Sequence, residues 1–312
     1  MRALIFPGQG SQAVGMGAAL AEASRTARDV FDEVDEALSQ NLFRLMVDGP
    51  EDELKLTENA QPAIMAHSLA VFRVLSRDGG VHLAKAANFV AGHSLGEYSA
   101  LCAAESFDLS TTARLLKLRG KAMQQAVPVG EGAMAALLGA DLALAQKIAA
   151  AAAENDVCTV ANDNDPSQVV ISGRKAAIDR AIALAKEFGA KRAIALPVSA
   201  PFHCPLMQPA ADAMAVALEG VAIASPAVAL YANVTAQPER DPDSIRARLV
   251  EQVTGMVRWR ETIANMAAEG TGQMIEIGGK VLGPMVKRTS PETQVTSLLS
   301  IEEIEALAKE IG

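Results

Sequence analysis

The chain has 312 residues, 50% of them hydrophobic and 21% charged, and it carries a formal net charge of −9. This composition is ordinary for a globular enzyme whose core forms one large domain or two unequal ones. The acidic balance argues against nucleic-acid binding, which needs a basic face, and no apolar stretch reaches the roughly eighteen uncharged residues of a membrane span.

The three cysteines, Cys102, Cys158 and Cys204, have neither metal-ligand spacing nor a paired framework. We interpret them as reduced thiols of a cytoplasmic protein and expect no metal site. The apolar run at the N-terminus is too short for a signal peptide, because Pro7 and Gly8 break it at once.

The chain begins with a predicted strand at residues 3–6, a glycine-rich loop at residues 7–12 and a helix from about Gly17. The loop fits neither the Walker spacing nor the dinucleotide-binding spacing. Gln9 is a candidate to donate a backbone N–H to an oxyanion, because the equivalent early loop has that role in nucleophile-elbow enzymes. The alternative is a plain strand-to-helix turn, which the spacing alone slightly favours.

Residues 25–80 are predicted to be helical, with turns near residues 48–50 and 78–80. Gln61 and Pro62 predict the start of a long helix, because proline is favoured in a helix's first turn. The turn at residues 78–80, Asp-Gly-Gly, ends this helical region.

Gly92, Ser94 and Gly96 match the nucleophile-elbow pattern Gly-x-Ser-x-Gly, in which a serine sits on a sharp strand-to-helix turn. Residues 89–91 read as the end of a buried strand and residues 95–104 as a helix start, which is the context that the motif requires. Such a turn presents the Ser94 hydroxyl and aims the first helical N–H groups, starting with Leu95, at an oxyanion. The alternative is a Gly/Ser turn that only joins strand to helix.

Residues 110–125 are predicted to form a helix capped by Ser110-Thr111-Thr112. At about 100° per residue, its basic side chains gather on one side and its apolar ones on the other, with Arg119 in the middle of the apolar side. An arginine there is costly unless it reaches solvent or meets an anion, which it can grip with two hydrogen bonds. The alternatives are a bound carboxylate and a structural ion pair with an Asp or Glu of this chain.

The segment 127–198 changes character. Strands are predicted at residues 133–138, 157–161, 168–172 and 192–198, helices at 142–154 and 175–188, and a turn at 162–166. The resulting order, strand-helix-strand-strand-helix-strand, is typical of the ferredoxin-like unit. We interpret this segment as a module inserted into a larger domain.

The proline-rich loop at residues 197–205 brings the chain back into that domain and carries His203. A histidine in a stiff loop at a domain junction is the best candidate for a general base. His67 and His82 are weaker candidates, and we expect His93 to point away from the nucleophile. No Asp or Glu stands out as the third member of a triad, so another group, such as a backbone carbonyl, is expected to orient His203.

The remaining chain completes the large domain. Helices are predicted at residues 209–218, 243–253 and 260–269, a strand at 227–232, a final core strand at 273–277 and an amphipathic terminal helix at 300–311. The predicted fold class is α/β. It comprises a large α/β-hydrolase-like domain with a parallel central sheet, residues 1–126 and 199–312, and an inserted ferredoxin-like subdomain, residues 127–198.

Together these motifs resemble those of the malonyl-CoA:acyl carrier protein transacylases of fatty acid synthesis, which are related to the acyltransferase domains of polyketide synthases. The matching segments run almost end to end and fall in the family's order. They are residues 6–12, 61–63, 92–100, 119–120, 168–173, 198–203 and 280–282, together with Asn162. One departure is Gly279 after Gly278, where relatives commonly carry a proline.

The resemblance implies a catalytic pair in which Ser94 is the nucleophile and His203 the base. It implies oxyanion donors from the backbones of Gln9 and Leu95. It also implies that Arg119 holds the free carboxylate of the malonyl group, a role that accounts for an arginine on an apolar helix face.

Further residues take their roles from the same resemblance. The backbone carbonyl of Gln252 is implied to orient the catalytic histidine, which fits the missing acid. Gln61, Asn162 and Phe202 are implied to line the substrate pocket. Phe202 resembles the malonyl-selective form of polyketide acyltransferases, in which its bulk excludes an α-methyl branch.

The function that the resemblance implies is a ping-pong transfer of malonyl from malonyl-CoA to the phosphopantetheine thiol of holo acyl carrier protein, through a malonyl-serine ester. No permanently bound cofactor is implied, because the CoA thioester is itself the substrate. The alternatives are a trans-acting polyketide acyltransferase, a serine thioesterase or hydrolase, and a non-catalytic docking subunit. We expect a monomer, because no long exposed apolar seam is apparent.

Overall fold

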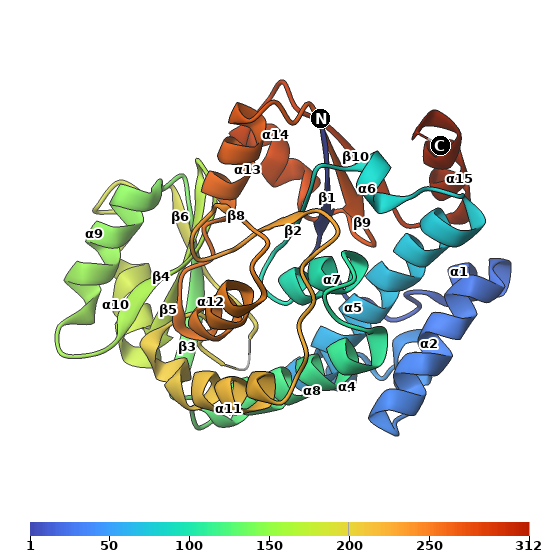
Figure 1. Cartoon of the computed structure of the whole chain (residues 1–312). Helices are drawn as coiled ribbons and strands as arrows, with labels where there is room; N and C mark the ends of the chain where they lie inside the picture. Colours follow the sequence, from blue (N-terminus) through green and yellow to red (C-terminus); the bar gives the residue numbers. More distant parts are fainter. Residues whose placement is uncertain (199, 312) are drawn as a thin grey trace.

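Two β-sheets organise the computed structural model, which describes residues 1–198 and 200–311 (Figure 1). The larger sheet has six strands in the order β10-β9-β1-β2-β7-β8, and the smaller has four in the order β4-β5-β3-β6. The strands of the larger sheet are β1 (Arg2–Phe6), β2 (Phe89–Gly92), β7 (Ala229–Tyr231), β8 (Pro238–Glu239), β9 (Gln273–Ile277) and β10 (Gln294–Leu298).

Parallel pairing runs through the larger sheet from β10 to β7, and only β8 is antiparallel to its neighbour. Both faces are covered, so alternate residues of one strand enter different cores. Leu4 and Phe6 of β1 join the core beneath one face, whereas Ala3 and Ile5 join the core on the other. The carboxyl ends of parallel strands meet at one edge of a sheet, and this edge is where α/β proteins place ligands.

Helices cover the two faces unequally (Figure 1). Helices α13 and α14 pack on one face through residues such as Trp259, Ile263 and Val286. Most other helices build the larger core on the other face. The helices outside the small sheet are α1 (Ala18–Ala23), α2 (Arg25–Leu38), α3 (Leu42–Asp48), α4 (Glu51–Lys55), α5 (Thr57–Arg73), α6 (Leu83–Ala86), α7 (Gly96–Ala103), α8 (Leu109–Gln125), α11 (Gln208–Glu219), α12 (Pro242–Thr254), α13 (Trp259–Ala268), α14 (Gly283–Thr289) and α15 (Ile301–Ile311).

The smaller sheet lies beside the larger one with α9 and α10 packed on it (Figure 1). Its elements are β3 (Gly132–Leu138), α9 (Leu142–Ala153), β4 (Cys158–Asp165), β5 (Gln168–Arg174), α10 (Lys175–Leu184) and β6 (Arg192–Ala195). This order confirms the predicted succession of strands and helices, and neighbouring strands all pair antiparallel. The predicted domain boundary at residue 199, and the last residue, 312, lie outside the described residues.

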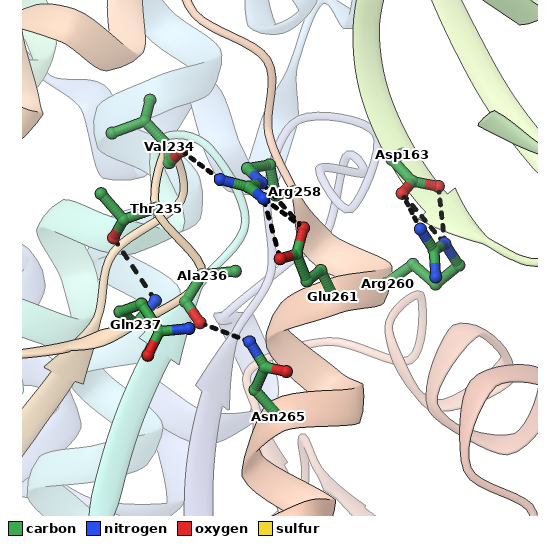
Figure 2. Close-up of polar contacts among 9 residues, drawn as sticks. All are labelled: Asp163, Val234, Thr235, Ala236, Gln237, Arg258, Arg260, Glu261 and Asn265. Carbon is green, nitrogen blue, oxygen red and sulfur yellow. Dashed lines mark hydrogen bonds and ion pairs between the residues drawn. The ribbon is translucent and has the colours of Figure 1, made fainter. Parts of the chain in front are cut away.

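Strand β4 joins the small sheet to the rest of the chain. Its backbone bridges to Val257, with Asp163 N–H donating to the Val257 carbonyl at 2.9 Å. The buried Asp163 carboxylate accepts from the Arg260 guanidinium at 2.8 to 3.1 Å (Figure 2). Asp165, also buried, pairs with Arg288 at 2.8 Å. A carboxylate this deeply buried needs such a partner, so these contacts fix how the small sheet sits.

The prediction of a turn at residues 162–166 was wrong. Strand β4 continues to Asp165, and only Pro166 and Ser167 turn. Asn and Asp favour turns because their side chains bond their own backbone. Here Asp163 and Asp165 are instead satisfied by distant arginines, so the local preference is overridden.

Two predicted helix starts were also wrong. Helix α5 begins at Thr57, so Pro62 lies inside the helix and removes one hydrogen bond to the Glu58 carbonyl. Residues 57–60 are helical because their side chains are almost all buried against neighbouring helices. Helix α8 is capped not by Ser110-Thr111-Thr112 but by Asp108, whose carboxylate accepts from Thr111 N–H at 2.6 Å.

Strand β9 was predicted to be the final core strand, but one more strand follows it in the chain. Strand β10 pairs parallel with β9 at the edge of the sheet. Its side chains are mostly half-exposed, so the apolar signal of a buried parallel strand is weak there. Between the two strands, the turn that lacks the family's proline is held by buried Glu276, which accepts from the N–H groups of Val281, Leu282 and Gly283 at 2.8 to 2.9 Å.

The contact between β4 and α13 generates a stability prediction. Arg260→Ala leaves the Asp163 carboxylate, whose side chain is 1% exposed, without its cation, and we expect a loss of about 3 kcal/mol in unfolding free energy. The matched control is Arg25→Ala, which removes an ion pair with Asp29 whose side chains are 85% and 48% exposed. It should cost less than about 1 kcal/mol. Urea unfolding followed by circular dichroism measures both, and equal losses would contradict a clamping role for Arg260.

Candidate active site

Ser94 lies on the tight turn between β2 and α7. Its φ is 53°, in the left-handed region that non-glycine residues rarely adopt. A Cβ on Gly92 would collide with the backbone of Gly96, and a Cβ on Gly96 would collide with the Phe6 carbonyl on β1. The two glycines of the motif are therefore required by the close approach of turn, helix and neighbouring strand.

His203 lies against the Ser94 hydroxyl. The distance from Ser94 Oγ to His203 Nε2 is 2.7 Å, and His203 Nδ1 lies 2.8 Å from the backbone carbonyl oxygen of Gln252. A carbonyl can only accept, so Nδ1 carries the proton and Nε2 is left to accept from the serine. Among the described residues no carboxylate takes part in this pair, and the histidine is oriented by the backbone of α12.

The surroundings keep His203 uncharged. Burial, first, and then the positive charge of Arg119 lower the pKa of His203 to about 3, while the Gln252 carbonyl acts in the opposite direction. The imidazole is therefore neutral at neutral pH and able to accept a proton. A neutral, oriented base beside a serine is the arrangement that activates a hydroxyl nucleophile.

Arg119 is the most unusual side chain of the site, because it is 1% exposed. Its guanidinium donates to Gln61 Oε1 at 2.8 Å, to Gln252 Oε1 at 2.8 Å and to Ser94 Oγ at 3.2 Å. None of the ion pairs within residues 1–198 and 200–311 involves it, so the alternative of a structural ion pair is wrong there. Arg119 Nε also has no hydrogen-bond partner among these residues. A guanidinium stays protonated in proteins, so the site holds a buried cation bound by neutral groups.

These groups line one cavity of about 430 Å³. Ser94, His203, Arg119 and Gln61 form a polar part, and apolar side chains form much of the remaining wall. The other lining residues are Gln9, Gly10, Gln12, Lys55, His93, Met123, Met134, Asn162, Leu196, Pro197, Val198 and Phe202. The predicted pocket residues Gln61, Asn162 and Phe202 thus all lie on its wall.

His93 was expected to point away from the nucleophile. Its Nε2 lies 2.9 Å from Asn164 Oδ1 and its ring lies 5.6 Å from that of Trp259, and the residue also lines part of the cavity. Burial lowers the pKa of His93, so it too is neutral. A larger cavity of about 510 Å³ around Arg73 and Cys102 contains neither Ser94 nor His203.

The two predicted oxyanion donors flank the serine. Leu95 follows it directly and caps helix α7, and Gln9 lies in the loop after β1, which pairs with β2. Within the described part of the chain, the N–H groups of Gln9 and Leu95 have no hydrogen-bond partner. Unpaired N–H groups, at a helix start in the case of Leu95 and in a loop in the case of Gln9, are available to an anion.

Asn233 was not predicted from the sequence, and its side chain hydrogen-bonds the backbone of the turn that carries Ser94. Its Oδ1 accepts from Ser94 N–H at 2.8 Å, and its Nδ2 donates to the Gly92 carbonyl at 2.7 Å. The signal was present: a polar residue stands just after the strand predicted at 227–232. In a parallel sheet, that position lies beside the carboxyl end of β2.

Glu97 was also missed. It is 1% exposed in the first turn of α7, and its Oε2 accepts from Gln252 Nε2 at 2.5 Å and from Asn233 N–H at 3.4 Å. Burial raises the pKa of Glu97 to about 8, against the opposing effects of these hydrogen bonds and of Arg119. Its sequence signal is an acidic residue directly after the Gly-x-Ser-x-Gly motif, at the start of the predicted helix.

Within residues 1–198 and 200–311, no group of three His, Cys, Asp or Glu side chains could hold a metal ion. None of the helices in that part of the chain is long and apolar enough to cross a bilayer.

Known proteins resemble this chain over its full length. The family described as "Acyl transferase domain" matches residues 3–294. The malonyl CoA-acyl carrier protein transacylase of Escherichia coli (strain K12) is 44% identical over 310 residues, 99% of each chain. The crystal structure of an acyl-carrier-protein-S-malonyltransferase from Bartonella henselae is 52% identical, with a TM-score of 0.97 over 100% of this chain and 99% of that one.

A further solved structure includes a partner. It shows a type II PKS acyl-carrier protein in complex with its malonyl-transacylase, which is 40% identical to this chain. Its TM-score is 0.95, and the match covers 99% of both chains.

The support from Asn233 can be tested without knowing the substrate. Asn233→Ala leaves Ser94 N–H and the Gly92 carbonyl unpaired, so we expect labelling of Ser94 by a fluorophosphonate probe to slow by at least about tenfold. Asn265→Ala is the matched control, because it also removes a bond to a backbone carbonyl, that of Ala236, but away from the serine (Figure 2). If both variants label alike while remaining folded, Asn233 does not position Ser94.

Proposed function

This chain belongs to the acyl transferase domain family, and we propose that it transfers malonyl from malonyl-CoA to the phosphopantetheine thiol of acyl carrier protein. The observation that carries the proposal is the buried Arg119 cation, 3.2 Å from the Ser94 hydroxyl in the same cavity. A serine nucleophile alone suits many acyl groups. A cation that forms no ion pair with a carboxylate of residues 1–198 and 200–311 suits an acyl group that brings a free carboxylate.

In the first half-reaction, Ser94 Oγ attacks the thioester carbonyl as its proton passes to His203 Nε2. The N–H groups of Gln9 and Leu95 stabilise the tetrahedral oxyanion, and one such donor is typically worth about 3 kcal/mol of barrier. The carbon–sulfur bond then breaks, His203 returns the proton to the CoA sulfur, and malonyl-Ser94 remains. The Gln252 carbonyl holds the imidazole in one tautomer throughout.

In the second half-reaction, the phosphopantetheine thiol occupies the place that CoA has left. His203 accepts its proton as the sulfur attacks the ester carbonyl, and Ser94 departs with the same proton. Arg119 holds the malonyl carboxylate in both halves. It therefore selects the acyl group and also fixes the ester in one pose.

The alternative of a serine hydrolase or thioesterase is not favoured. Hydrolases with this elbow carry an acid between serine and histidine in chain order. Here His203 Nδ1 faces a backbone carbonyl, and hydrolysis needs no buried cation. A trans-acting polyketide acyltransferase would use the same chemistry with a different carrier protein.

We further propose that the chain forms an α/β-hydrolase-like domain and a ferredoxin-like subdomain around a malonyl-selective pocket. The parallel sheet with an elbow after β2 supports an α/β-hydrolase-like domain, residues 1–126 and 199–312. The order β4-β5-β3-β6 supports a ferredoxin-like subdomain, residues 127–198. The position of Phe202 on the cavity wall supports selection against an α-methyl branch. Three buried free cysteines support a cytoplasmic location, and a monomer remains our prediction.

The covalent intermediate provides the direct test. Brief mixing with malonyl-CoA should add one malonyl group to the intact chain, and holo acyl carrier protein should then discharge it. Ser94→Ala should show no adduct, because the attacking hydroxyl is gone. Intact-protein mass spectrometry measures both, and free malonate accumulating without an adduct would instead indicate a hydrolase.

The role of Arg119 generates a separate prediction. Arg119→Ala removes the partner of the malonyl carboxylate, so kcat/KM for malonyl-CoA should fall by at least about a hundredfold. The value for acetyl-CoA, which has no free carboxylate, should fall by less than about tenfold. Arg114→Ala, an exposed arginine on the same helix, is the control and should change neither. An unchanged ratio of malonyl to acetyl transfer in Arg119→Ala would exclude the selecting role.

A further inference from the structure

One side-chain amide joins the buried cation of the site to a buried acid. Arg119 Nη2 donates to Gln252 Oε1 at 2.8 Å, and Gln252 Nε2 donates to Glu97 Oε2 at 2.5 Å. Arg119 and Glu97 are each 1% exposed, and their side chains form no direct ion pair within the described residues. The Gln252 amide therefore stands between a guanidinium and a carboxyl group, with its dipole aligned to both.

The other groups around Glu97 are neutral. Asn233, after β7, offers it a backbone N–H, and Gln252, on α12, offers its amide. Within residues 1–198 and 200–311, Arg119 on α8 and Tyr98 on α7 are the ionisable side chains that interact electrostatically with Glu97. Burial raises the pKa of Tyr98, so its hydroxyl stays protonated. Arg119 is thus the one charge in this part of the chain that the protonation state of Glu97 can balance.

The two protonation states of Glu97 prepare Arg119 differently. With Glu97 protonated, the buried site carries the single positive charge of the guanidinium, and an entering carboxylate makes it neutral. With Glu97 ionised, the site is already balanced, and an entering carboxylate leaves a net negative charge in a medium of low dielectric. Such an unpaired buried charge is strongly disfavoured.

Building on the proposed function, we propose that Glu97 is a specificity-determining positioning residue that acts through the Gln252 amide on Arg119. Protonated Glu97 leaves the guanidinium free to pair with the carboxylate of a dicarboxylic acyl group. Ionised Glu97 already neutralises the charge of the guanidinium, so the site then favours neutral acyl groups. When a malonyl group enters a site whose Glu97 is ionised, one proton is taken up from solvent onto the Glu97 carboxylate, and it is released when the malonyl group leaves.

The inference predicts a pH-dependent choice between acyl groups. The experiment measures the ratio of kcat/KM for malonyl-CoA to kcat/KM for acetyl-CoA from about pH 6.5 to about pH 9.5. Effects on His203, on the CoA phosphates and on the acceptor thiol are common to both substrates and cancel in the ratio. Since the pKa of Glu97 is raised to about 8, the acid is neutral below that pH. The ratio should therefore be constant below about pH 7.5 and fall by up to about tenfold per unit above pH 8.

Glu97→Gln is the decisive variant. Glutamine keeps an oxygen that can accept from Gln252 Nε2 but cannot ionise, so the ratio should stay flat across the whole pH range. Glu58→Gln is the matched control, because it removes a carboxylate that pairs with Lys117 on the same helix as Arg119, and it should keep the fall seen in the native protein. A flat ratio in the native protein, or an unchanged fall in Glu97→Gln, would overturn the inference.

A binding measurement gives a second readout. Titration calorimetry of malonyl-CoA into Ser94→Ala, in two buffers of different ionisation enthalpy, counts the protons taken up on binding. We expect an uptake near pH 9 that approaches one proton, disappears near pH 6 and is absent with acetyl-CoA. If neither malonyl nor acetyl forms an adduct on Ser94 in the native protein, the proposed function fails. If adducts form but no proton is taken up, only the role of Glu97 fails.

Discussion

The site depends on the way in which Gln252 is presented by the end of helix α12. Gln252 lies in the last turn of that helix, where backbone carbonyls have no partner within the helix. Its carbonyl is therefore free to accept from His203, while its side chain bonds both Arg119 and Glu97 and donates to the Ser94 carbonyl at 3.0 Å. One residue thus sets the tautomer of the base, the position of the cation and the backbone of the nucleophile.

The parallel sheet explains why groups so distant in the chain meet there. Strands β1, β2 and β7 are neighbours that run in the same direction, so the segments that follow them lie side by side. They deliver Gln9, Ser94 and Asn233 to one edge of the sheet. The strained backbone of Ser94 persists because the Asn233 side chain bonds to it on both sides, at Ser94 N–H and at the Gly92 carbonyl. The sheet topology therefore brings together residues that no local sequence motif pairs.

Whether a feature depends on a local motif or on the sheet topology decides whether it could be predicted from the sequence. The elbow and the apolar-side position of Arg119 are local patterns, and the parallel sheet, the second sheet and the order of elements follow from strand and helix periodicity. The loop position of His203 made it the best candidate for the base, and the family resemblance paired it with Ser94 and pointed to Gln252. Asn233 and Glu97 escaped because their partners lie far away in the chain. The Asp163 region was misread for the same reason, since its apparent turn chemistry is satisfied by a distant arginine.

The neutral coordination of Arg119 is what makes it useful for selection. Had a carboxylate of this chain paired directly with the guanidinium, an incoming acyl carboxylate would have to displace a buried charge, which is costly. Two amide oxygens and a hydroxyl hold the guanidinium in place without cancelling its charge. Burial makes that charge expensive in the free protein, and an entering anion relieves the cost. The stability given up to bury an uncompensated cation is thus recovered when an anionic acyl group binds, so a cost to the fold becomes a source of specificity.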